Sequence, residues 1–113
     1  MEKEEFKRRT KMFAINTARF CKTLQYDPVI RSHINQVVLL SSSVRSNYRK
    51  SKADFVNKMR IVEEEVDESL FFFKLLAEFY PDRKDELRVL YKEGDEILAM
   101  TESINTASKG LKK

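Results

Sequence analysis

The stretch from Phe55 to Tyr80, FVNKMRIVEEEVDESLFFFKLLAEFY, decides the fold of this 113-residue chain. Positions 55, 59, 62, 66, 69, 73, 76 and 80 step by alternating fours and threes, and seven of the eight are apolar or aromatic. This spacing places them on one side of a helix, as in the helices of a bundle. The pattern therefore predicts a helix over 52–80, with Ser51 as its N-cap and Pro81 just beyond its end.

Two apolar patterns precede this stretch. The first includes Phe13 and Phe20 and predicts a helix over about 6–24. Pro28 disfavours helical geometry in the residue before it and suits the first turn of a helix. We therefore expect a second helix over about 29–49, with its buried face on residues 30, 34, 37, 38, 44 and 48.

A fourth helix is expected over about 83–107, with Asp82 as its N-cap. Gly94 lies in its middle, where glycine costs about 1 kcal/mol relative to alanine. A close crossing with another helix explains a glycine at this place. The buried side of the helix is expected to hold Leu87, Leu90, Gly94, Ile97, Thr101 and Ile104.

The connections between these helices are short, and the chain has only two Gly and two Pro to make turns. The sequence therefore predicts an all-α fold, an antiparallel up-down-up-down four-helix bundle. We expect one domain over 1–113, with a frayed tail over 108–113.

The apolar runs are too short for a membrane helix. The longest, VVLL at 37–40 and LFFF at 70–73, fall far below the roughly 18 residues that a spanning helix requires. The chain opens with MEKEEFKRR, which lacks the apolar core of a signal peptide, and its single cysteine cannot form an internal disulfide. We expect a cytoplasmic protein that does not associate with membranes.

The residues of known catalytic and metal sites are scarce. A di-iron bundle needs several histidines, whereas His33 is the only one, so Glu64 and Glu68 are expected on a solvated face. Two glycines cannot form a phosphate-binding loop, and Cys21 has no histidine partner in its pattern. We therefore expect no enzyme activity, no cofactor and no metal.

Charge is divided unevenly along the chain. Residues 1–60 hold 14 Lys and Arg against 5 Asp and Glu, whereas residues 61–113 hold 8 against 13. The basic helices can neutralise the acidic ones, or they can leave a basic face for a polyanion such as RNA or DNA. The candidate phosphate contacts are Arg45, Arg49, Lys50 and Lys52 near the second interhelical turn, and Arg8, Arg9 and Lys11 in the first helix.

The segment around residue 71 contains more apolar side chains than one buried face of a helix can accommodate. Leu70 to Phe73 point in four successive directions around a helix, so some of these side chains must lie elsewhere. Either the core is wide, or an apolar surface mediates self-association. The candidates for an oligomer interface are Ile61, Phe71, Phe72 and Phe79.

The segments SSSVRSNYR (41–49), SKADFVNKMRIVEEEVDES (51–69) and LFFFKLL (70–76) carry a family resemblance. The chain resembles the four-helix-bundle proteins encoded in intervening sequences of bacterial 23S ribosomal RNA genes, most densely over 41–76. Relatives usually have several more residues between the Asn-Tyr pair and the Ser-Lys-x-Asp-Phe motif. Here only Arg49 and Lys50 lie between them, so the turn between the second and third helices is expected to be tighter and more positively charged than in these relatives.

The resemblance implies a homo-oligomer, since relatives include barrel-shaped pentamers. It also extends to accessory proteins of diversity-generating retroelements, which bind nucleic acid together with a reverse transcriptase. The expected function is therefore a non-catalytic, oligomeric nucleic-acid-binding accessory protein. The alternative is an interaction scaffold that docks a partner enzyme such as a reverse transcriptase and does not contact nucleic acid.

Overall fold

The computed structural model describes residues 3–24, 27–47 and 52–110, with side chains over 4–24, 27–36, 39 and 56–107. These residues contain helices and no strand, which confirms the all-α prediction for the part of the chain that is described. The elements are α1 (Lys3–Lys22), α2 (Pro28–Asn47), α3 (Lys52–Phe79), the 3-10 turn η1 (Pro81–Arg83) and α4 (Lys84–Gly110).

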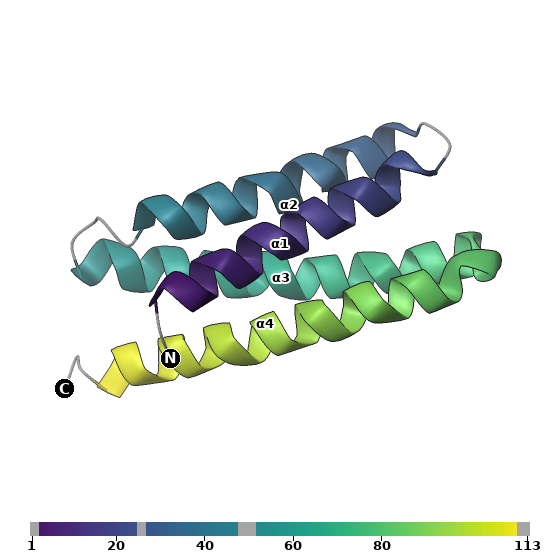
Figure 1. Ribbon diagram of the computed structural model, residues 1–113. Helices are drawn as coiled ribbons and strands as arrows, with labels where there is room; N and C mark the ends of the chain where they lie inside the picture. The colour runs from purple at the N-terminus through teal and green to yellow at the C-terminus, as the bar shows by residue number, and fades with distance from the viewer. Residues whose placement is uncertain (1–2, 25–26, 48–51, 111–113) are drawn as a thin grey trace.

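The helices lie side by side in a rod of 48 × 20 × 20 Å. Figure 1 shows the chain running from left to right in α1 and α3, and from right to left in α2 and α4. Each helix packs against its neighbours in sequence, and α1 also packs against α4. The last helix continues to Gly110, so the backbone remains helical where a frayed tail was expected from residue 108.

The side of α3 that the sequence pattern selected faces the core. Met59, Val62, Val66, Ser69, Phe73 and Leu76 are all buried, as the three–four stepping predicts. The buried side is wider than this stepping, because Val56, Leu70 and Phe72 are buried as well. At its centre the rings of Phe73 and Phe13 meet edge to face, with centroids 5.9 Å apart.

Helix α1 begins three residues before its predicted start. Phe6 is fully buried, so the core extends into the first turns of the helix. Glu4 and Glu5 lie in the first turn, where negative charge interacts favourably with the helix dipole. Thr10 and Thr17 continue the buried side between the phenylalanines, although both are polar.

Gly94 confirms the expected close crossing. A Cβ atom at this position would lie 2.8 Å from Cδ2 of Leu70 and 3.1 Å from two ring carbons of Phe13. Side chains from α1 and α3 therefore occupy the space that any larger residue of α4 would need.

The predicted N-cap of the last helix, Asp82, is wrong. Pro81 opens a 3-10 turn that contains Asp82, and α4 starts only at Lys84. Arg83 fixes this turn against the end of α1. Its Nε donates to Oε1 of Glu86 at 2.6 Å and its Nη2 donates to Oγ1 of Thr23 at 2.8 Å, while the guanidinium lies 4.7 Å from the ring centroid of Phe20.

Candidate functional site

The outward side of α3 carries an apolar surface. Phe71, Leu75 and Phe79 follow one another at steps of four residues and are 63%, 41% and 75% exposed, and Ile61 is 45% exposed. At about 100° per residue, these four side chains fall within roughly 80° of the helix circumference and span about 27 Å of its length. We call Ile61, Phe71, Leu75 and Phe79 the α3 stripe.

Carboxylates lie beside and within the α3 stripe, because Glu64 and Glu68 separate Ile61 from Phe71 on the same side of the helix. Glu64, Glu68 and Glu78 are exposed on the same side of the helix, and Asp67 is exposed close by. Between residues 61 and 79 the only cation is Lys74. Any partner that binds this surface must therefore offer apolar side chains to the α3 stripe and positive charge to the neighbouring carboxylates.

Phe72 does not belong to this surface, contrary to the prediction. It is only 5% exposed. The centroid of its ring lies 3.7 Å from the ring centroid of His33 in α2, and the two ring planes are tilted by 32°. The two neighbouring phenylalanines differ by about 100° in direction, so α2 covers Phe72 and leaves Phe71 in solvent. The remaining predicted interface residues, Ile61, Phe71 and Phe79, are exposed on one face.

His33 is held in a partly apolar contact between α2 and α3. Burial lowers its pKa below the usual 6.5, and a hydrogen bond to the backbone of Glu68 and the charge of that carboxylate oppose this shift. Its Nε2 is buried and makes no hydrogen bond. The pKa of Glu65 is raised, because the carboxyl is partly buried and lies near Glu68 and Glu64.

The cations predicted in the first helix have different environments. Arg8 is exposed and lies 3.7 Å from Glu5 of the next turn toward the N-terminus. Arg9 is less exposed and pairs with Glu96 of α4 at 2.6 Å, so its charge joins two helices. Lys11 is exposed and makes no ion pair with the part of the chain that the structure describes. The side chains of Arg45 and Lys52, and the whole of Arg49 and Lys50, lie outside the described residues.

Two further cations complete a basic face on α1. Arg19 and Lys22 are exposed, and their spacing from Arg8 and Lys11 places all four within about 80° of the helix circumference. We call Arg8, Lys11, Arg19 and Lys22 the α1 basic face; it extends over about 21 Å of the helix. Helical spacing in the sequence could have revealed Arg19 and Lys22, and it could also have added Leu75 to the α3 stripe.

Cys21 and clusters of metal-ligating side chains are two further places to look for a chemical site in the described residues. Burial raises the pKa of Cys21 to about 11, which keeps the thiol protonated near neutral pH and makes it a poor nucleophile. His, Cys, Asp and Glu side chains nowhere form a group of three suited to a metal ion among the residues described. Within the same part of the chain, no helix is both long and apolar enough to cross a membrane.

Comparison of the chain with protein-family models, curated proteins and solved structures finds no match in any of the three. The candidate function therefore rests on the two surfaces just described, the α3 stripe and the α1 basic face.

Proposed function

We propose that this protein is a non-catalytic, antiparallel up-down-up-down four-helix bundle whose function is to assemble with copies of itself. The observation that carries the proposal is the α3 stripe, with four large apolar side chains between 41% and 75% exposed on one helix face. Phe71, Leu75 and Phe79 are neighbours at steps of four residues, and exposed apolar patches of this kind often mark interfaces. The direction of the chain in Figure 1 and the packing of each helix on its neighbours support the bundle topology.

The α1 basic face of a second copy fits the α3 stripe in charge and in length. Exposed acids border the stripe, and four exposed cations follow α1 over a similar distance. Met12, which is 36% exposed, lies among these cations and offers apolar contact. Since the two surfaces lie on different helices, each copy uses one to bind the copy before it and the other to bind the copy after it. Such heterologous contacts form a ring when the rotation between copies closes, and a closed ring would accord with the pentamers that the family resemblance implies.

Size-exclusion chromatography with light scattering tests the proposal. We expect the wild-type protein to be an oligomer at micromolar concentration. Phe71→Glu places a charge in the middle of the stripe and should therefore yield monomers. The variant should still fold, because the exposed side chain of Phe71 contributes little to the core. The matched control is Val89→Glu, at a 67% exposed position of α4 outside the stripe, which should leave the oligomer intact. A monomeric wild-type protein would contradict the proposal.

A second candidate function is nucleic-acid binding, and the α1 basic face favours it. Four aligned cations offer a phosphate-binding track whose affinity falls steeply with salt and depends weakly on sequence. Filter binding of RNA and DNA at rising salt tests this function. The double variant Arg8→Glu with Arg19→Glu should weaken nucleic-acid binding through the α1 basic face. The variant Arg49→Glu tests the cation predicted at the turn between the second and third helices. Unchanged affinity for nucleic acid in both variants rules this candidate function out.

Salt separates the two functions further. If the α1 basic face binds a second copy, assembly should weaken at high salt in the absence of nucleic acid. If the face binds phosphates, the oligomer should persist at high salt while only nucleic-acid binding is lost.

A further inference from the structure

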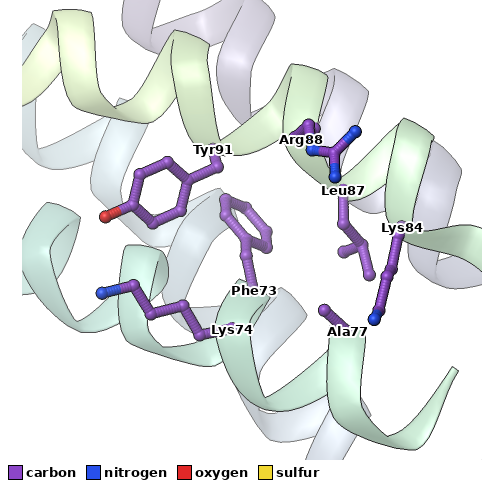
Figure 2. Close-up of a pocket in the computed structure, with 7 residues that line it drawn as sticks. All are labelled: Phe73, Lys74, Ala77, Lys84, Leu87, Arg88 and Tyr91. Carbon is purple, nitrogen blue, oxygen red and sulfur yellow. The ribbon is translucent and has the colours of Figure 1, made fainter. Parts of the chain in front are cut away.

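A pocket of about 360 Å³ opens between the end of α3 and the start of α4. Figure 2 shows Phe73 and Ala77 from α3 and Leu87 and Tyr91 from α4 around it. Phe73 and Leu87 belong to the core, so the floor of the pocket is apolar. Ala77 is small, and this leaves the space between the two helices unfilled.

Three cations line the edges of this pocket, and Figure 2 shows Lys84 and Arg88 at one end and the ammonium of Lys74 at the other, beside Tyr91. Lys74 comes from α3, and Lys84 and Arg88 come from α4. They are three of the eight Lys and Arg residues after residue 60, in a part of the chain where Asp and Glu outnumber them by 13 to 8. The pocket therefore has three cations in a part of the chain whose net charge is negative.

These cations remain available to a ligand. Lys74 and Lys84 make no ion pair with the described residues, and Lys74 lies with its ammonium 5.6 Å from the ring centroid of Tyr91. Arg88 approaches Asp85 at 3.5 Å, with both side chains highly exposed, and such a surface pair is weak. Glu78 and Asp95 lie within two turns of these cations on their helices, yet neither forms an ion pair with them.

We propose that this pocket binds a small amphipathic anion, with an apolar body on the floor and a carboxylate at the end where Lys84 and Arg88 lie one turn apart on α4. Ligand pockets commonly combine an apolar lining with a few convergent polar groups. The volume of about 360 Å³ equals that of roughly a dozen water molecules at about 30 Å³ each, which is room for a small ligand such as a medium-chain carboxylate. Arg88 supplies a planar fork that can bind a carboxylate through two hydrogen bonds, and Lys84 adds a second positive charge one turn earlier on the same helix.

Isothermal titration calorimetry with decanoate, below its micelle concentration, tests the proposal on the protein in its natural oligomeric state. Decanol and decyltrimethylammonium serve as neutral and cationic probes of the same chain length. We expect decanoate to bind at least tenfold more tightly than either probe. Equal affinity for decanol and decanoate overturns the proposal. It would show that the cations do not contact the carboxylate and only cover apolar surface with their aliphatic stems.

Variants locate the site. Lys84→Gln with Arg88→Gln should weaken decanoate binding about tenfold and leave the fold intact, since both side chains are exposed. Lys92→Gln, an exposed cation of α4 outside the pocket, is the matched control and should have no effect. Ala77→Leu should abolish binding by filling the pocket, with circular dichroism to verify folding. Undiminished binding in the double variant refutes this site, and it does so whether or not the protein assembles through the α3 stripe.

Discussion

Gly94 shows how a single residue sets the distance between helices. Its missing side chain lets Leu70 and Phe13 approach α4. Gly94→Leu should lower the free energy of unfolding by about 2 kcal/mol, because overpacking outweighs the gain in helix propensity. Urea denaturation measures this change, with Ser103→Leu on the exposed side of the same helix as the control. Equal stability of Gly94→Leu and the wild-type protein would contradict the close crossing.

His33 makes the stability of the bundle depend on pH. Its pKa in the folded chain lies below 6.5, so the unfolded chain binds the proton more readily. The stabilisation is complete above pH 6.5 and is lost as the pH falls from there toward the lower pKa of the folded protein. Thermal melts between pH 7.5 and 5 should show a fall in stability that is smaller in His33→Gln.

The raised pKa of Glu65 acts in the opposite direction, since proton uptake by this carboxyl favours the folded chain. The wild-type protein must therefore be compared with His33→Gln at each pH. If the two proteins lose stability in parallel on acidification, His33 does not have the role assigned to it.

At the scale of the element, α1 contains two buried threonines with different hydrogen bonding. Thr10 donates its hydroxyl to the carbonyl oxygen of Phe6 at 2.6 Å, whereas Oγ1 of Thr17 is buried without a hydrogen-bond partner. Thr17→Val should raise the free energy of unfolding by about 1 kcal/mol, because it removes an unsatisfied polar group at nearly constant shape. Thr10→Val is the matched control and should not stabilise the protein. Chemical denaturation that ranks Thr17→Val below the wild-type protein would contradict this account.

The same scale shows how far the sequence predicts the fold. The apolar spacing of α3 was sufficient to predict its bounds to within one residue, because seven of eight positions agree. Thr10 and Thr17 do not stand out in an apolar pattern, which is why the buried side of α1 was predicted only in part. The N-cap at Asp82 was predicted wrongly, because a proline at the preceding position also suits a 3-10 turn.

The candidate site was less predictable, because it depends on which helices become neighbours. Phe71 and Phe72 are adjacent and chemically identical, and only the position of α2 buries one and exposes the other. Arg9 and Glu96 are 87 residues apart, and no local pattern shows that they pair. The pocket cations also come from two helices, so their presence at one pocket becomes visible only once α3 packs on α4.

At the scale of the whole molecule, the first half of the chain has a surplus of basic residues and the second half a surplus of acidic ones. Ion pairs within one copy neutralise this difference only in part. Arg9 and Glu96 form a pair between α1 and α4. The α1 basic face and the acids beside the α3 stripe remain on the outside. The proposed heterologous contact between copies would bring these opposite charges together and cover the apolar side chains as well.

Charge reversal, followed by light scattering after size exclusion, tests this contact most directly. Arg8→Glu with Arg19→Glu should give monomers, and Glu64→Lys with Glu78→Lys should do the same, because each variant sets like charges against one another. The account predicts that all four substitutions together restore the wild-type oligomer. A combined variant that stays monomeric, or pairs of reversals that leave assembly unchanged, would contradict the contact between the α1 basic face and the α3 stripe.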